Sequence, residues 1–595
     1  MAQEIAPVRK HEVFHPVKVI ITAQKDTVID FGQNLVGWAV IKINGKAGEY
    51  IQLNHAEVLD KDGNFYTLNL RFAKSEVKYI LKGGEQTLEP HFTYQGFRYL
   101  RIKGYRGKLD TANIRAVALY SDMKNTGNLV TSNPLLNQLQ HNIQWGQKGN
   151  FVDVPTDCPQ RDERLGWTGD AQAFSKTAAY NMNVGGFFTK WLKDLAADQR
   201  EDGAIPWVIP NMMPKTNAGV AGWSDVATII PWNMYLTYGD KRILATQYES
   251  MKAWVNYIQA KSINDLWNTG FNFGDWCFYS PSPTDDSGKA AVTDKYLIAQ
   301  CFYANSTQIL INTAEVLGKE DDVKKYTELL DRIKKAFLKE YVTGSGRVVS
   351  STQTAYLLTL SFDMLPVSLR DQLAQRLVQN IKDYGNHLTT GFLGTPYLCH
   401  VLTRFGYDDM AYTLLLQDTY PSWLYPVKKG ATTIWERWDG IKADGSLQSP
   451  SMNSFNHYSY GAIGDWMYRV MAGINTDEKE TGYKKIVIAP HPGGNLTLVN
   501  GTLETMYGKV QSKWQMADTT FTLDVTVPVN TGAEIILPKA ANASVTENGQ
   551  PVAQVNTIKG IRKDNTDLKF SVGSGTYHFQ YIMPKSLTTN VLSVN

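Results

Sequence analysis

The stretch Ser132-Asn-Pro-Leu-Leu-Asn-Gln-Leu-Gln-His-Asn-Ile143 is the point where the patterning of the chain changes from strands to helices. Pro134 stands near the first position of a helix, where its missing N–H costs nothing. Leu136, Leu139 and Ile143 follow at spacings of three and four residues, so they share one face. The stretch therefore predicts the first helix of a new domain.

Apolar residues recur at helical spacing from this stretch to about residue 472. Three of the stripes run over Phe188–Leu195, Val323–Phe337 and Leu373–Ile381, and long loops rich in Gly, Pro, Asn and Trp separate them. A helical region of roughly 340 residues is too large for a four-helix bundle, whereas paired helices that close into a toroid accommodate it. We expect functional side chains on the loops at one end of that toroid.

Short runs of β-branched and aromatic residues stand on both sides of the helical region. On the N-terminal side they are Val17–Thr22, Tyr50–Asn54, Val77–Leu81 and Phe97–Ile102; on the C-terminal side they are Ile486–Ala489, Leu496–Val499, Phe521–Val527 and Tyr577–Tyr581. Asn548-Gly549 is a hairpin turn signal. We predict an N-terminal arm (1–16), an antiparallel β-sandwich (17–122), the helical domain (123–474) and a second antiparallel β-sandwich (475–595).

The composition excludes several classes of partner. The 595 residues include 60 basic and 57 acidic side chains, and no Lys/Arg run is present, so we expect neither a nucleic acid nor an anionic membrane surface as a partner. No apolar run reaches the roughly 20 residues of a membrane span. The N-terminal residues do not resemble a signal peptide, and we expect a soluble protein, periplasmic or cytoplasmic. The oligomeric state stays open, with a homodimer among the alternatives.

We expect neither a metal nor a cofactor. The four cysteines are scattered without a CxxC pair, which is typical of neither a disulfide framework nor a zinc site. His11-Glu-Val-Phe-His15 matches the zinc-protease pattern, but that pattern needs a helix that brings both histidines to one face. Pro16 disfavours helix at His15, and a strand pattern follows.

The segment Asp153–Asp170 is the most informative for chemistry. Pro155, Pro159 and Gly166 make it irregular, and a helix is predicted to begin near Thr168. It contains five carboxylates, two arginines and a tryptophan: Asp153, Asp157, Asp162, Glu163, Asp170, Arg161, Arg164 and Trp167. Carboxylates held close together raise at least one pKa, as a general acid near neutrality requires. The alternative is a solvated charged loop or an acidic helix N-terminus.

Further acidic and aromatic residues recur in the later loops. They occur in Thr432-Thr-Ile-Trp-Glu436-Arg-Trp-Asp439, in Ser454-Phe-Asn-His457, and in the pairs Trp223/Asp225 and Asp275/Trp276. Each could be core packing, and Glu436 could be a buried, arginine-paired carboxylate. Together they suit a pocket for a neutral polyhydroxylated ligand, because tryptophan faces stack on a sugar ring while carboxylates and histidine bind its hydroxyls.

These segments resemble the α-L-rhamnosidases of glycoside hydrolase family 78. The run Asp157-Cys-Pro-Gln-Arg-Asp-Glu-Arg-Leu-Gly-Trp-Thr-Gly-Asp170 is similar to the family signature. Four other blocks match in type and order: Gly222-Trp-Ser-Asp, Gly274-Asp-Trp, Thr433-Ile-Trp-Glu436-Arg-Trp and Asn456-His457. The run from Gly501 to Trp514 resembles the family's C-terminal sandwich, and the similarity extends from about residue 17 to the end.

The resemblance implies a six-hairpin (α/α)6 barrel flanked by an N-terminal and a C-terminal antiparallel β-sandwich. It implies an enzyme that releases terminal α-L-rhamnose, with inversion, from rhamnose-containing oligosaccharides or plant glycosides. Glu163 matches the general acid and Glu436 the general base that activates water. The positions that match rhamnose-holding residues are Asp157, Arg161, Trp167, Asp170, Trp223, Trp276 and His457. Family members commonly carry further N-terminal β modules, and we expect neither those modules nor their calcium here.

Inversion requires room for a water between acid and base, so the resemblance implies that Glu163 and Glu436 are about 6.5–9.5 Å apart. Asp157 and Asp170 compete with Glu163 for the acid role. Another (α/α)6 glycosidase or a uronate-acting lyase is an alternative, because fold alone does not fix chemistry. A non-catalytic glycan-binding relative is a further alternative; it predicts loss of one glutamate, yet both are present.

Overall fold

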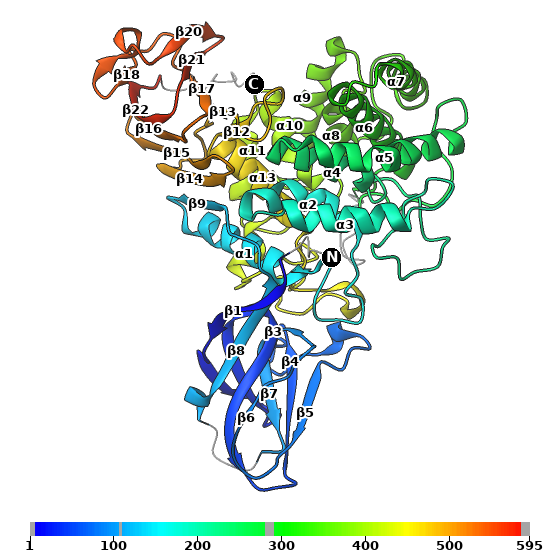
Figure 1. The fold of residues 1–595 in the computed structure, drawn as a ribbon, viewed down its shortest axis with the longest axis vertical. Helices are drawn as coiled ribbons and strands as arrows, with labels where there is room; N and C mark the ends of the chain where they lie inside the picture. The colour runs from blue at the N-terminus through cyan, green and yellow to red at the C-terminus, as the bar shows by residue number, and fades with distance from the viewer. Residues whose placement is uncertain (1–5, 106–109, 280–290, 585–595) are drawn as a thin grey trace, which may run out of the picture. The chain divides into compact units, whose positions relative to one another are not determined.

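A computed structural model describes residues 6–105, 110–279 and 291–584. The chain divides into two compact units (Figure 1). The first contains Met1–Lys124, Gln138–Met234 and Asp240–Gly464, and the second contains Asn125–Asn137, Tyr235–Gly239 and Asp465–Asn595.

The first unit begins with an antiparallel β-sandwich organised around one long strand, β3 (Thr27–Gly45). A register shift between Asp30 and Leu35 interrupts its pairing, so β3 can bend and bond different partners along its length. Those partners are β2 (Lys18–Ile21), β6 (Gly84–Leu88), β7 (Gln95–Lys103) and β8 (Ile114–Ser121). Next, β4 (Tyr50–Ala56) joins β7 to β5 (Glu76–Ile80), and β1 (Val8–Phe14) pairs with β8.

The sequence-predicted strands of this sandwich correspond to β2, β4, β5 and β7. Buried apolar side chains of the sandwich, including Ile29, Leu53, Phe97 and Leu100, form one core. The His11-Glu-Val-Phe-His15 pattern lies in and just after the extended strand β1. Its two histidines therefore do not share a helix face.

Paired helices form the rest of the first unit. Consecutive helices pack as hairpins, for example α6 (Lys295–Val316) with α7 (Glu320–Tyr341) and α8 (Gln353–Ser361) with α9 (Val367–Asp383). The other helices are α2 (Thr168–Asn181), α3 (Gly185–Asp198), α5 (Lys241–Lys261), α10 (Leu398–Arg404), α11 (Asp408–Leu416), α12 (Leu424–Lys428) and α13 (Ile463–Trp466). Helices α1 (Pro134–Asn150), α4 (Val226–Tyr238) and α13 contribute residues to both units.

Two kinds of helix alternate along the chain. Helices α2 and α8 are buried almost all round, whereas α7 and α9 bury one apolar stripe and expose the rest. This difference is typical of an inner and an outer layer of helices. The helices predicted from Ser132–Ile143, from the three apolar stripes and from Thr168 are all present, as α1, α3, α7, α9 and α2.

The second unit contains the C-terminal β-sandwich. One sheet has the order β12 (Ile474–Thr476), β13 (Lys485–Ile488), β17 (Gly532–Leu537), β21 (Asp567–Val572) and β20 (Lys559–Asp564). The other has the order β19 (Gln550–Pro551), β18 (Thr546–Glu547), β22 (Gly575–Ile582), β16 (Thr520–Val527), β15 (Gly508–Ala517), β14 (Leu498–Thr505) and β9 (Gly127–Thr131). The buried Trp514 ring packs on Phe521 in its core.

Two local features of this sandwich follow from sequence. Asn548 and Gly549 both have positive φ, as the tight β18–β19 turn requires. Strand β9, which lies within the predicted helical domain, pairs instead with β14. Its alternating pattern buries Leu129 and exposes its neighbours, which favours a strand over a helix. No helix among the described residues combines the length and apolar composition that a membrane span requires.

Candidate active site

The acidic segment between α1 and α2 is a closed, rigid loop. It begins with a tight hairpin of β10 (Phe151–Val152) and β11 (Val154–Pro155), turned by Asp153 at φ 67°. The backbone N–H of Asp157 then donates to the Leu165 carbonyl at 2.9 Å, and the N–H of Leu165 donates to Asp157 Oδ1 at 3.0 Å. These two bonds close the loop, so the residues between them are held in fixed orientations.

A close backbone approach fixes the end of this loop. The Ile209 N–H donates to the Gly166 carbonyl at 2.9 Å, and a Cβ on Gly166 would lie 2.0 Å from the Ile209 oxygen. Only glycine fits there. The next residue, Trp167, is the N-cap of α2, and Asp170 lies in the first turn of that helix, as the sequence predicts.

The second acidic segment is fixed by pairing with the histidine segment. The Glu436 N–H donates to the Ser454 carbonyl at 3.0 Å, and the Ser454 N–H donates to Glu436 Oε2 at 2.8 Å. The His457 N–H donates to the Ile434 carbonyl at 2.8 Å. Glu436 and His457 therefore lie side by side although twenty residues separate them.

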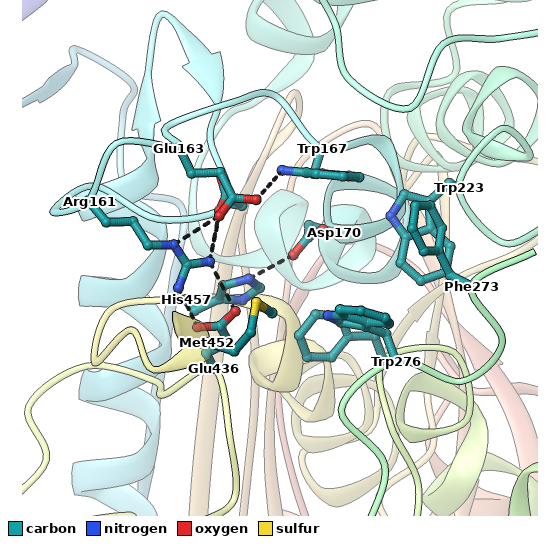
Figure 2. A pocket seen from close by; sticks show the side chains of 12 residues that line it. Arg161, Glu163, Trp167, Asp170, Trp223, Phe273, Trp276, Glu436, Met452 and His457 are labelled. Atoms are coloured by element: carbon teal, nitrogen blue, oxygen red, sulfur yellow. Dashed lines mark hydrogen bonds and ion pairs between the residues drawn. The ribbon is translucent and has the colours of Figure 1, made fainter. Parts of the chain in front are cut away.

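All nine side chains predicted for the site line one pocket of about 410 Å³. Figure 2 shows the carboxylates, Arg161 and His457 on one side and aromatic rings on the other. The nine are Asp157, Arg161, Glu163, Trp167, Asp170, Trp223, Trp276, Glu436 and His457. Phe273, Phe392 and Met452 complete the lining.

The guanidinium of Arg161, which is 1% exposed, joins the two glutamates. Its Nη1 and Nη2 donate to Glu436 at 2.7 and 3.0 Å, while Nε donates to Glu163 Oε2 at 2.9 Å. Nη2 also lies 2.9 Å from that Glu163 oxygen. The other Glu163 oxygen accepts from the Trp167 indole N–H at 2.9 Å. One buried cation thus orients both carboxylates from different edges of its plane.

The carboxylates of the pocket differ in their proton affinity. Burial raises the pKa of Glu436, but the charge and hydrogen bonds of Arg161 outweigh burial and lower it to about 2. Burial and the charge of Glu163 raise the pKa of Asp157 well above its ordinary value. Burial also raises the pKa of Asp170, against the opposing charge of His457. Glu436 is therefore the carboxylate best held in its ionised form.

His457 and Asp170 form a second polar pair in the pocket. Nε2 of His457 lies 3.1 Å from Asp170 Oδ1, which also accepts from the Ser459 hydroxyl at 2.7 Å. The buried Nδ1 of His457 has no hydrogen-bond partner among the described residues. The pair thus uses one ring nitrogen of His457 and leaves the other buried without a partner among the described residues.

Aromatic side chains form the opposite wall of the pocket. Phe273 is at its centre, with ring centroids 4.7 Å from Trp223, 5.7 Å from Trp276 and 5.9 Å from Trp167. Trp223 is buried, whereas Trp276 is 38% exposed at the rim. Flat rings of this kind suit the C–H face of a sugar.

Sequence reasoning missed the other three lining residues. Phe273 directly precedes Gly274-Asp-Trp276, so its position beside that block is a signal that could have indicated it. Phe392 stands in a turn and Met452 ends the short 3-10 helix Pro450–Met452, both without a motif, and only the tertiary fold brings them to the pocket.

The aspartates beside Trp223 and Trp276 in the sequence have structural roles. Asp225 accepts from the Gly222 N–H, the Trp254 indole and the Ser306 hydroxyl. Asp275 accepts from the backbone N–H groups of Gly391, Leu393 and Gly394. Neither lines the pocket, and both fix the loops that present the tryptophans.

Asp157, Cys158 and Glu163 have potential metal ligand atoms within 4.8 Å of one another. Arg161 already supplies a positive charge to this cluster, 3.5 Å from Asp157 and 2.9 Å from Glu163. Burial and the charge of Asp157 raise the pKa of the Cys158 thiol, whereas metals bind the thiolate. The donor set therefore suits an arginine–carboxylate cluster better than a metal site.

Three family models match successive parts of the chain. The bacterial alpha-L-rhamnosidase 6 hairpin glycosidase domain matches residues 124–471. The concanavalin-like domain of bacterial alpha-L-rhamnosidases matches residues 21–120, and their C-terminal domain matches residues 473–551. The sequence-predicted architecture of a six-hairpin barrel with flanking β-sandwiches is thereby confirmed.

Two curated proteins named alpha-L-rhamnosidase align with nearly all of the chain. The one from Streptomyces avermitilis is 43% identical over 582 residues, which is 97% of this chain and 54% of that protein. The one from Formosa agariphila is 41% identical over 576 residues, 96% of this chain and 61% of that protein. The chain thus spans between about half and three fifths of the length of these relatives.

Solved structures agree with these alignments. The Streptomyces avermitilis alpha-L-rhamnosidase complexed with L-rhamnose matches with a TM-score of 0.91 at 43% identity, over 97% of this chain and 54% of that one. The native alpha-L-rhamnosidase from Aspergillus terreus matches with a TM-score of 0.89 at 37% identity, over 97% and 64%.

Proposed function

Because the chain belongs to the α-L-rhamnosidases of glycoside hydrolase family 78, we propose that it hydrolyses terminal α-L-rhamnosides with inversion at the anomeric carbon. In this proposal Glu163 is the general acid and Glu436 the general base. The substrate is a rhamnose-containing oligosaccharide or glycoside, as the rhamnose complex of the Streptomyces relative suggests.

The observation that supports this proposal best is the bridge through Arg161. Glu163 and Glu436 bind different edges of the Arg161 guanidinium and both line the pocket. In an inverting enzyme we expect the two carboxyl groups to be about 6.5–9.5 Å apart, which leaves room for a water. A retaining enzyme would need a separation of about 5–5.5 Å.

The chemistry follows from these two positions. Glu163 donates a proton to the glycosidic oxygen as the bond from that oxygen to the anomeric carbon breaks, so the leaving group departs as an alcohol. Glu436 accepts a proton from a water whose oxygen bonds the anomeric carbon on the opposite face. The product is rhamnose of inverted configuration. Exchange of one proton with solvent then restores the acid and the base.

The remaining lining residues suit rhamnose recognition. Trp276 and Trp223, with Phe273 between them, offer apolar faces for one side of the ring. Asp170 and His457, which pair with each other and line the pocket, supply polar groups on the side that would meet its hydroxyls. We propose that these side chains, with Asp157, Arg161 and Trp167, hold the sugar between acid and base.

A rhamnoside assay with product analysis tests the proposal. The wild type should release rhamnose from an aryl α-L-rhamnoside with a poor leaving group, and NMR should show the β-anomer first. Glu163→Gln and Glu436→Gln should each lose at least about 1,000-fold in turnover. Asp153→Asn is a matched control, because Asp153 lies in the same loop, is 60% exposed as a side chain and pairs with Lys190. First appearance of the α-anomer, or full activity in either glutamine variant, would contradict the assignment.

A further inference from the structure

A buried carboxylate on the N-terminal sandwich faces the loop that holds Glu436. Glu57 follows strand β4 and is 2% exposed. Its Oε2 accepts from the backbone N–H of Phe455 at 3.1 Å and from the Asn69 amide at 3.0 Å. Its Oε1 accepts from the Asn34 amide at 3.1 Å. Three N–H donors therefore converge on one carboxylate.

The partner of this carboxylate lies directly beside the partner of Glu436. Phe455 donates its N–H to Glu57, and the preceding residue, Ser454, donates its N–H to Glu436 Oε2 at 2.8 Å. Ser454 also accepts from the Glu436 N–H. Two consecutive backbone N–H groups thus connect a carboxylate of the sandwich to the carboxylate of the pocket.

Two asparagines of the sandwich hold the same backbone. The Asn69 amide donates to the Asn453 carbonyl at 3.2 Å, and the Asn34 amide donates to the Phe455 carbonyl at 3.3 Å. Both asparagines also donate to Glu57. Residues 453–455 are therefore bound on both sides, by the sandwich and by Glu436.

We propose that Glu57 is a positioning residue for the general base Glu436, acting through the backbone of Ser454 and Phe455. The inference rests on the function proposed above. Without Glu57 the Phe455 N–H and the two asparagine amides would lose their shared acceptor inside a buried interface. The segment would then shift, and a shift of about 1 Å in a reacting group costs on the order of 100-fold in rate.

The chemistry of Glu57 favours this role over simple packing between sandwich and barrel. A buried carboxylate costs more than an apolar side chain of similar size, so packing alone would favour an apolar residue. The charged groups that act on Glu57 are Arg161 and Glu436, and the other neighbours are neutral amides. Burial raises the pKa of Glu57 to about 7 despite its hydrogen bonds. A glutamine keeps one oxygen that can accept from the Phe455 N–H and the Asn69 amide, although its own amide nitrogen cannot accept from Asn34.

The kinetic test compares Glu57→Ala with Glu57→Gln. Glu57→Ala should lower kcat about 10- to 100-fold with little change in KM, whereas Glu57→Gln should stay within about threefold of wild type. Because a base defect does not involve the leaving group, the loss should be equal for aryl rhamnosides with good and poor leaving groups. Equal losses in the two variants, or a loss confined to poor leaving groups, would overturn the proposal.

A matched control separates positioning from stability. His55 lies on the same sandwich, is as buried as Glu57 and bonds the Ser75 carbonyl within the sandwich. His55→Ala should lower Tm while kcat remains within about twofold of wild type. A kcat loss in His55→Ala that equals that of Glu57→Ala would overturn the specific role.

Hydrogen exchange tests the contact without any substrate. In Glu57→Ala, the backbone amide hydrogens of a peptide covering 453–457 should exchange with solvent faster than in wild type. In His55→Ala their exchange should be unchanged. Unchanged exchange in Glu57→Ala would overturn the proposal whatever the enzyme hydrolyses. Failure of the proposed function would be visible separately, as a wild type that releases no rhamnose or a Glu436→Gln variant that remains active.

Discussion

Arg161 binds the carboxylate of Glu436 with two nitrogens, Nη1 at 2.7 Å from Oε2 and Nη2 at 3.0 Å from Oε1. Both side chains are 1% exposed. A bidentate pair of this kind is strong where water is excluded, and it keeps Glu436 ionised although burial alone would protonate it.

Replacing Arg161 by glutamine should move the pH dependence of the enzyme. In wild type the pKa of Glu436 is about 2, so the proposed base is ionised above that pH and is protonated only as pH falls through it. Without Arg161, burial raises this pKa, and the acidic limb of kcat/KM should move to higher pH. Activity at neutral pH should fall at least about 100-fold, and stability by about 3–5 kcal/mol.

A pH–rate profile between pH 3 and 8, with thermal unfolding in parallel, tests this expectation. Arg164→Gln is the control, because Arg164 lies in the same loop but bonds the Tyr94 carbonyl. If the acidic limb of kcat/KM lay at the same pH in Arg161→Gln as in wild type, Arg161 would not set the ionisation of the proposed base.

Arg71 of the N-terminal sandwich should affect the acid rather than the base. Its Nε lies 2.6 Å from Asp162 and its Nη2 lies 3.3 Å from Glu163 Oε2. Arg71→Met removes one of the donors that orient Glu163, so kcat should fall about 3- to 10-fold. The loss in kcat should grow as the leaving group becomes poorer, because substrates with poor leaving groups depend most on protonation of the glycosidic oxygen.

A series of aryl α-L-rhamnosides of different leaving-group pKa measures this dependence. Arg98→Met is a matched control, since Arg98 lies on the same sandwich and pairs with Asp30. If Arg71→Met lowered kcat equally for every leaving group, Arg71 would not be orienting the acid.

The fold could be predicted where local patterning decides it. The stripe from Leu136 to Ile143 keeps a helical spacing, and the run from Phe521 to Val527 keeps the two-residue alternation of a strand. The structure has the predicted helix there as α1 and the predicted strand as β16. Strand β3 was not predicted, because its nineteen residues bond four partners in turn and no single alternation describes it. Strand β9 was missed as a strand, because its alternation covers only five residues and its partner β14 is more than 350 residues away in sequence.

The residues in and around the site also divide into those that the local sequence indicates and those that only the tertiary fold reveals. Glu163 and Trp167 stand in one dense segment, so chemistry and resemblance both indicate them. Glu57 and Arg71 stand alone in strand-rich sequence, and only the contact of the sandwich with residues 451–455 brings them close to the loops that hold the two glutamates. Contacts that depend on tertiary structure leave no local signal.

Gly169 should be sensitive to the addition of a single methyl group. A Cβ there would lie 2.5 Å from the Trp223 ring, which is 3% exposed and cannot move freely. Gly169→Ala should therefore displace Trp223, weaken rhamnose binding about 10-fold and cost about 1–3 kcal/mol of stability. An exposed helical glycine would instead gain up to about 1 kcal/mol from the same change.

Calorimetric binding of rhamnose and thermal unfolding measure both effects. Gly146→Ala is the control, because Gly146 is also helical and its added Cβ would meet ordinary contacts at 3.7 Å or more. If Gly169→Ala bound rhamnose as tightly as wild type, the position of Trp223 would not limit binding.

Asp157 and Asp170 should bind sugar rather than donate the catalytic proton. Burial raises the pKa of both aspartates. Asp157 Oδ1 accepts the Leu165 N–H of the closed loop, and Asp170 Oδ1 accepts from the Ser459 hydroxyl and lies 3.1 Å from His457 Nε2. These contacts tie Asp157 to the loop backbone and Asp170 to the histidine segment, and we expect both side chains to hold the sugar.

Leaving-group dependence distinguishes the three carboxylates. Glu163→Gln should slow poor leaving groups far more than activated ones, because an activated aryl group departs without protonation. Asp157→Asn and Asp170→Asn should lower kcat/KM about 10- to 100-fold equally for every leaving group, since they remove contacts to the sugar. If the loss in either asparagine variant grew with leaving-group pKa while Glu163→Gln stayed flat, that aspartate would be the acid and Glu163 would be a binding residue.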